Sequence, residues 1–271
     1  MRYVLGPAGR RALGRFTRSR PLLAFDYDGT LAPIVSDPAR AAVRTGTREL
    51  LTRLAARYVC VVVSGRPRRD LVRRLAGVGL AEAIGNHGIE PWNTSARAAR
   101  VVRHWRRQLV ARLSPLDGVI VEDKVYSISL HYRRARDTKR AKVAVLEAAT
   151  TLDGARLIAG KRSVSVLPAF APNKGVAVEE ALARFGCGTA LFVGDDTTDE
   201  DVFALDQPGR LLTIRVRRRL DSAAQYYIRN QSEIDVLLAR LLALAPGGEG
   251  RRRQPRPRRS PRQGWLPGRW R

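Results

Sequence analysis

A short apolar run that ends in two aspartates constrains this chain more than any other feature of its sequence. Leu22 to Phe25 is apolar at every position, which is typical of a strand buried on both faces. Asp26 and Asp28 follow it and lie two residues apart, so in extended backbone both carboxylates point the same way. One carboxylate can then attack a substrate while the other moves protons. A plain turn is the alternative, whereas a calcium loop is excluded because Gly29 falls at its fourth position instead of its sixth.

Strands and helices alternate along much of the chain, which is the pattern of parallel β-α-β units. The pattern predicts strands at 22–25, 59–63, 190–193 and 211–216, and helices at 47–58, 68–75, 173–185, 199–205 and 234–244. Ligands of such sheets gather at the carboxyl ends of the strands. Since the polar clusters of this sequence follow such strands, we expect them to meet in one site.

The alternation changes between residues 91 and 167, where the sequence predicts an inserted domain. Its segments are a long helix at 95–113, strand-like residues at 119–132, a helix at 138–151 and a segment at 156–167. We therefore predict an α/β fold with a Rossmann-like parallel-sheet core and an inserted small α/β cap. The expected ranges are a basic N-terminal segment at 1–20, a discontinuous core at 21–90 and 168–245, the cap at 91–167 and a disordered tail rich in Arg, Pro and Gly at 246–271.

A cluster of acids after the predicted strand at 190–193 suits a metal ion. The segment from Asp195 to Asp201 holds five acidic residues in seven positions, and such crowding is costly without a cation. Hard carboxylate oxygens suit Mg²⁺, which takes one or two carboxylates and keeps waters or a phosphate oxygen. The alternative is a solvated helix N-terminus, which accounts for Glu200 and Asp201 but not for Asp195.

Two further residues each have a functional and a structural interpretation. Lys174 follows a good N-cap, Asn173, but a cation in the first turn of a helix opposes the helix dipole. It can hold the charge of a transferring phosphoryl group and keep Asp26 ionised, or it can be a surface lysine. Ser64 follows the strand at 59–63, where its hydroxyl can bind a phosphate oxygen or cap the helix near Arg68.

The charge of the chain points only weakly to nucleic acid. The net charge is +25, but residues 1–20 contribute +6 and residues 246–271 contribute +8, so over half of the excess lies at the two ends. Arginine supplies 45 of the 50 basic residues, which a biased codon supply explains as well as a selected surface does. We expect no specific nucleic-acid partner, although the basic tails can bind anionic surfaces non-specifically.

The same composition favours a soluble cytoplasmic monomer. The two cysteines, Cys60 and Cys187, cannot form a disulfide framework. No apolar stretch approaches the roughly 18 residues that a membrane span needs. Residues 1–20 hold six arginines and no acid, which a mitochondrial transit peptide would also show, and we rank that alternative lower.

Taken in order, the four clusters resemble the four motifs of the haloacid dehalogenase-like superfamily of phosphohydrolases. Over about residues 20–245, longer strings resemble trehalose-6-phosphate phosphatases more narrowly: residues 25–34 (FDYDGTLAPI), 64–66 (SGR), 85–88 (GNHG), 131–133 (HYR), 173–175 (NKG) and 194–201 (GDDTTDED). The resemblance implies a Rossmann-like core, a small α/β cap inserted after the second core motif, and Mg²⁺ as cofactor.

The resemblance also implies roles for the matching residues. Asp26 would attack phosphorus to form an aspartyl-phosphate, and Asp28 would act first as the acid and then as the base. Ser64 and Lys174 would hold the phosphoryl oxygens. The metal site would consist of Asp26, the Asp28 carbonyl and Asp195, supported by Asp199. The residues that would contact the sugar phosphate are Arg66, Asn86, His87, Glu122, Lys124 and Lys161.

Two positions depart from the family pattern and bear on the substrate. Ser165 stands where a second sugar-binding glutamate is expected, and serine reaches less far toward sugar hydroxyls. Leu167 replaces an expected arginine. The leading hypothesis is Mg²⁺-dependent hydrolysis of trehalose 6-phosphate to trehalose and phosphate. The alternatives are a phosphatase for another sugar or glycosyl phosphate, and a binder of nucleic acid or anionic surfaces through the arginine-rich tail.

Overall fold

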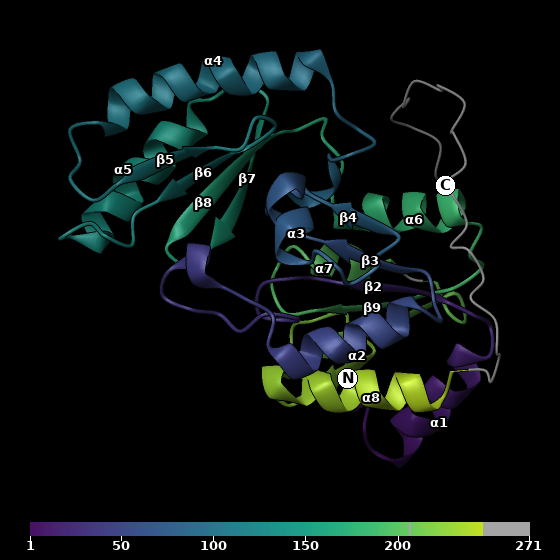
Figure 1. Cartoon of the computed structure of the whole chain (residues 1–271). Helices are drawn as coiled ribbons and strands as arrows, with labels where there is room; N and C mark the ends of the chain where they lie inside the picture. The colour runs from purple at the N-terminus through teal and green to yellow at the C-terminus, as the bar shows by residue number, and fades with distance from the viewer. Residues whose placement is uncertain (206, 246–271) are drawn as a thin grey trace.

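The structure is a computed structural model that describes residues 1–205 and 207–245, and these residues form a parallel-sheet core and a smaller antiparallel unit (Figure 1). The tail predicted to be disordered, residues 246–271, lies outside the described residues. The predicted fold class, a parallel α/β core with an inserted α/β cap, is confirmed.

The core sheet brings together the strands that precede the predicted clusters. Its order within the described chain is β1-β11-β10-β9-β2-β3-β4, and all its pairs are parallel. The strands are β1 (Arg2–Tyr3), β2 (Leu22–Phe25), β3 (Cys60–Val63), β4 (Glu82–Ile84), β9 (Ala190–Gly194), β10 (Leu211–Val216) and β11 (Tyr226–Ile228). Every residue of β2, β3 and β9 is buried, as their unbroken apolar runs predict. Because β9 and β3 flank β2, the ends of these three strands are neighbours.

Helices cover both faces of the core sheet. One face packs against α1 (Pro7–Thr17), α2 (Thr45–Ala55), α3 (Arg68–Arg74) and α8 (Ile234–Ala243). The other face packs against α6 (Lys174–Phe185) and α7 (Glu200–Phe203). Side chains alternate along β2, so Leu23 and Phe25 belong to the first layer while Leu22 and Ala24 belong to the second. Figure 1 shows α1, α2 and α8 on one side of the sheet and α6 on the other.

The smaller unit, here called the cap, lies along the chain between β4 and α6. In the described residues its antiparallel sheet has the order β5-β6-β8-β7. Its elements are α4 (Ala96–Leu113), β5 (Ile120–Asp123), β6 (Ile128–His131), α5 (Thr138–Thr150), β7 (Ala155–Gly160) and β8 (Ser163–Pro168). Apolar side chains of α4 and α5 pack on one face of this sheet. Side chains on the other face, among them Ser129 and Ser165, line a cavity shared with the core.

Local sequence signals explain where several helices begin and end. Ser95 accepts a hydrogen bond from the backbone N–H of Ala98 and caps α4, and Asn173 caps α6 through the backbone N–H of Val176. Gly186 ends α6 in the left-handed conformation with φ 65°, which glycine adopts without strain. Three strands, β1, β4 and β11, are only two or three residues long, too short for the apolar pattern that predicted the others.

Residues 1–20 form part of the packed core, although the sequence sets them apart as a basic segment. β1 pairs with β11 at the edge of the sheet, and Val4 and Leu13 are fully buried. The arginines of α1, such as Arg11, lie on its exposed side. The segment therefore contains an amphipathic helix, and the arginines on the exposed face of this helix account for much of its basic composition.

Among residues 1–205 and 207–245, no helix combines the length and the apolar character that crossing a bilayer requires.

Truncation of a buried α1 side chain tests the place of this helix in the core. We expect Leu13→Ala to lower the free energy of unfolding by about 2–5 kcal/mol, because it removes a fully buried side chain and leaves a cavity. Urea denaturation measures this change. Arg11→Ala, on the exposed side, is the control and should change the value by less than about 0.5 kcal/mol. Equal losses in the two variants would contradict the packing of α1.

Candidate active site

A cavity of about 1090 Å³ lies between the strand ends of the core and the open face of the cap. Core residues in its lining follow β2, β3, β4 and β9 or begin α6: Asp26, Asp28, Ser64, Arg66, His87, Asp195, Asp196 and Lys174. Cap residues in its lining are Glu122, Lys124, Ser129, His131, Arg133, Lys161, Ser163 and Ser165. The structure thus brings most of the predicted site residues together. Two of them, Asn86 and Asp199, lie behind the lining.

A buried ammonium joins two carboxylates at the floor of the cavity. Lys174 Nζ donates to Asp26 Oδ1 and to Asp199 Oδ1, each at 2.8 Å, and all three side chains are at most 5% exposed. Burial lowers the pKa of Lys174, but the carboxylates of Asp199 and Asp26 outweigh it and hold that pKa well above its usual value. Lys174 is therefore an ammonium, and its place in the first turn of α6 is explained by these two partners.

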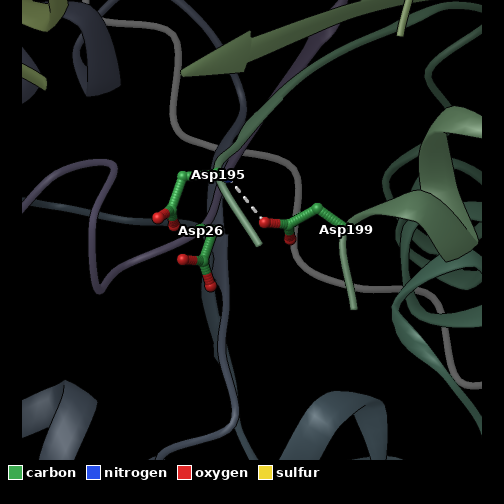
Figure 2. Close-up of side chains that lie close together, drawn as sticks. All are labelled: Asp26, Asp195 and Asp199. Carbon is green, nitrogen blue, oxygen red and sulfur yellow. Dashed lines mark hydrogen bonds between the residues drawn. The ribbon is translucent and has the colours of Figure 1, made fainter. Parts of the chain in front are cut away.

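Asp195 completes the floor and has a free buried oxygen. Figure 2 shows Asp26, Asp195 and Asp199, each of which offers an oxygen within 4.8 Å of the others. Asp199 is fully engaged, since its Oδ2 accepts the backbone N–H groups of Asp195 at 2.7 Å and Asp196 at 2.9 Å. Asp195 Oδ1 is buried and has no hydrogen-bond partner among the described residues. Burial, helped by the charges of Asp199 and Asp196, raises the pKa of Asp195 to about 7. A buried acceptor among carboxylates fits a divalent cation.

Gly29 allows the loop after β2 to reach this floor. Its φ is +86°, a conformation that side chains disfavour, and a Cβ at this position would lie 2.2 Å from Asp195 Oδ2. Only glycine lets the backbone and this carboxylate approach so closely.

Asp28 lies in the same cavity with its carboxylate held by an arginine fork. Arg66 Nε and Nη2 donate to Asp28 Oδ2 and Oδ1, each at 2.7 Å. The same guanidinium donates to Asp70 Oδ2 at 2.9 Å and to the Pro38 carbonyl at 2.7 Å. Burial lowers the pKa of Arg66, but Asp28 and Asp70 together raise it above its usual value. In this arrangement the Arg66 guanidinium orients the Asp28 carboxylate.

Ser64 and His87 form one wall of the cavity. Ser64 is buried, and its Oγ accepts the backbone N–H of Arg66 at 3.2 Å. Burial lowers the pKa of His87 to about 3, assisted by the charges of Lys174 and Lys124. His87 therefore presents a neutral imidazole to the cavity.

Asn86 joins the cap to the core and does not line the cavity. Its Nδ2 donates to Glu90 Oε2 at 2.7 Å and to the Lys124 carbonyl at 3.2 Å. Its Oδ1 accepts from Ser127 Oγ at 2.6 Å. The amide is fully buried, and its oxygen and nitrogen are both used in contacts within the protein. The predicted contact of Asn86 with a sugar phosphate stays a prediction.

Charged cap residues face the catalytic floor from the opposite side. Glu122 Oε2 lies 2.9 Å from His131 Nε2 and 3.8 Å from Lys124 Nζ. Burial raises the pKa of Glu122, but His131 and Lys124 outweigh it and lower the pKa, so Glu122 is an anion. Lys124 Nζ also donates to the Gly65 carbonyl of the core at 3.2 Å. Lys161 is exposed at the turn between β7 and β8.

The two departures from the family pattern have distinct surroundings. Ser165 lies beside Ser129 on the neighbouring strand, with 3.3 Å between their Oγ atoms, so this part of the cap face carries two small hydroxyls. Leu167 is buried in a small apolar cluster between the cap and the core. Its cross-strand neighbour on β7 is Arg156. The adjacent strand thus carries an arginine directly opposite the position where the family pattern expects one.

Arg215 and Arg133 have clear contacts in the site, although the sequence assigns them no role. Arg215, on β10, donates to the carbonyls of Asp195 at 2.6 Å and Asp196 at 3.1 Å and so holds the acidic loop. For Arg215, the sequence offered one signal of a special role: a charged residue inside the apolar run at 211–216. Arg133 donates to the carbonyls of Val35 and Ser36, which lie in the core, and no local pattern indicates that contact.

Solved structures share the architecture of this chain, a parallel-sheet core with a cap. The C-terminal domain of Candida albicans trehalose-6-phosphate phosphatase has a TM-score of 0.73 at 22% identity, covering 87% of this chain and 97% of that one. A haloacid dehalogenase-like hydrolase from Bacteroides thetaiotaomicron has a TM-score of 0.57 at 15% identity, covering 82% of this chain and 99% of that one. At these identities the likeness concerns the fold.

Sequence comparison identifies the family to which the chain belongs. The family model described as trehalose-phosphatase matches residues 24–225, and the chain belongs to that family. The trehalose-phosphate phosphatase of Mycolicibacterium paratuberculosis is 33% identical over 251 residues, covering 85% of this chain and 64% of that protein. The Mycobacterium ulcerans protein of the same name is 32% identical over 257 residues, covering 87% of this chain and 65% of that protein. This chain thus spans slightly less than two thirds of the length of these relatives.

The lowered pKa of His87 predicts a loss of stability in acid. The unfolded chain binds the proton near pH 6.5 and the folded chain only near pH 3, so this stabilisation is complete above about pH 6.5 and declines as pH falls. At about pH 5 the loss from His87 should be about 2 kcal/mol. Urea unfolding at about pH 7.5 and about pH 5 should show a larger drop for the wild type than for His87→Gln. Equal drops would contradict a buried neutral imidazole.

Proposed function

We propose that this chain is an Mg²⁺-dependent phosphatase that hydrolyses trehalose 6-phosphate to trehalose and phosphate through an aspartyl-phosphate. The observation that carries the proposal is the meeting of Asp26, Lys174 and Asp195 on one buried floor beneath a cap. Membership of the trehalose-phosphatase family and the names of the relatives support the substrate.

The proposed nucleophile is Asp26, which stands at the end of β2 with Oδ1 bonded to Lys174. Its attack forms a bond from the carboxylate oxygen to phosphorus and breaks the bond from phosphorus to the sugar oxygen. Asp28 gives a proton to that leaving oxygen. It then takes a proton from the water that attacks phosphorus and releases Asp26. Ser64 Oγ and the Lys174 ammonium hold the phosphoryl oxygens as their charge develops.

The residues present fit Mg²⁺. Asp26, the Asp28 carbonyl and Asp195 would hold the ion, which when bound neutralises charge on the phosphoryl group. The unpartnered Oδ1 of Asp195 supports this assignment. Asp199 would support the site without binding the ion directly, because its two oxygens already accept hydrogen bonds from Lys174 and from backbone N–H groups.

The cap supplies groups for the sugar. Glu122 is an anion that accepts hydroxyl donors, while Lys124 and Lys161 donate. On the core side the neutral His87 and the guanidinium of Arg66 complete the expected contacts. A cytoplasmic location is part of this proposal, because both cysteines of the described residues are free thiols.

Replacement of the nucleophile is the direct test. Asp26→Asn should lower kcat for phosphate release from trehalose 6-phosphate at least about 1000-fold, because an amide cannot form the phospho-enzyme. Phosphate release is measured with Mg²⁺ and after chelation, and the wild type should need the metal. Glu49→Gln removes an exposed carboxylate of α2 as the matched control and should leave the rate unchanged. Full activity of the Asn variant would refute the assignment.

A second candidate, a phosphatase for another sugar or glycosyl phosphate, is favoured by the paired hydroxyls of Ser129 and Ser165. A panel of glucose, sucrose and glycosyl phosphates separates the two candidates by kcat/KM. Preference for trehalose 6-phosphate supports the first candidate, and preference for another member keeps the mechanism and changes the substrate.

A further inference from the structure

Arg156 connects the cap to the chain segment that carries the catalytic lysine. It lies on β7, the edge strand of the cap sheet, and its Nη2 donates to the carbonyls of Ala171 at 3.3 Å and Pro172 at 2.9 Å. Pro172 is two residues before Lys174. A cap side chain therefore holds the backbone from which the catalytic ammonium extends.

The segment that Arg156 holds has little room to move. A Cβ on Gly88 would lie 2.8 Å from the Asn173 carbonyl oxygen, and one on Gly175 would lie 2.5 Å from the Asp201 carbonyl oxygen. The backbone on each side of Lys174 is thus pressed against the loop after β4 and against α7. A displacement of the Pro172 carbonyl would be passed on to the ammonium of Lys174, since close-packed interiors transmit strain.

The position of Arg156 is energetically unfavourable for its guanidinium. Its Nε is buried and has no hydrogen-bond partner among residues 1–205 and 207–245. Burial also lowers the pKa of Arg156, and the nearby Asp201 only partly offsets that effect. A cation with an unsatisfied buried N–H is less favourable than an apolar side chain of similar size. A local cost of this kind is typical of a functional residue.

Arg156 does not line the cavity, so it acts through another residue and not on the substrate. We propose that Arg156 is a positioning residue for the phosphatase reaction. By holding the Ala171 and Pro172 carbonyls, it sets the place of Lys174 between Asp26 and Asp199 and couples the cap to the catalytic floor. The inference rests on the proposed phosphatase function.

The test compares Arg156→Met and Arg156→Lys with the wild type on two substrates. Trehalose 6-phosphate uses the cap face, whereas p-nitrophenyl phosphate carries no sugar. Arg156→Met should lower kcat roughly 10- to 100-fold for both substrates, because the loss lies in the shared phosphoryl step, while KM stays within about twofold. Arg156→Lys, which can still donate to one carbonyl, should recover part of the loss. Arg136→Met removes a cap arginine whose side chain is 95% exposed and should match the wild type.

The following outcomes would overturn the inference that Arg156 is a positioning residue. A loss confined to trehalose 6-phosphate would make Arg156 a sugar contact, and unchanged kcat in both variants would leave it without a role in the reaction. Thermal unfolding is measured in parallel, and loss of the fold in both Arg156 variants would assign the residue to stability alone. A wild type that hydrolyses neither ester would refute the proposed function and this inference with it, whereas an active wild type with unaffected variants refutes the inference only.

Discussion

The ammonium of Lys174 between Asp26 and Asp199 is the interaction on which the site depends. The ends of β2 and β9 place several carboxylates in a buried region, where like charges repel strongly and the ionised form is disfavoured. A cation at hydrogen-bond distance from two of them makes this crowding tolerable. The cation must come from a rigid element, and the capped first turn of α6 provides one. The fold therefore has to bring the start of α6 to the edge of the sheet.

The sequence predicts the parts of this molecule that depend on local pattern. β2 and β9 could be predicted because strands buried on both faces are apolar at every position. The position of Asp26 after β2 indicated a reactive carboxylate, whereas Lys174 taken alone left a surface lysine open and received its expected role from the family resemblance. Contacts between distant segments could not be predicted from local pattern. Asn86 stands in a phosphatase-like string, yet its amide is consumed by Ser127, which is 41 residues away. Arg156 lies in an ordinary strand pattern, and only the folded structure brings it to the Ala171 and Pro172 carbonyls.

The core and the cap divide the chemistry between them. The floor residues that we propose to act on phosphorus come from strand ends and α6, which are held by the core sheet. The cap contributes the groups that would distinguish one alcohol from another, on a face where Ser129 and Ser165 are small. Arg66 stands between these two sets, because its guanidinium binds Asp28 while it lines the space for the substrate.

Three of the contacts by which the cap docks on the core share one property. Lys124, Arg133 and Arg156 donate to the carbonyls of Gly65, Ser36 and Pro172 respectively, and each of these acceptors is core backbone. Through these three contacts the cap recognises the path of the core chain, whereas Asn86 adds a contact that depends on the identity of a core side chain. Core loops around the entrance can exchange their side chains through evolution, as long as that path is kept, without a matching change in the cap. Adaptation to a new substrate and maintenance of the closed architecture are in this way largely independent.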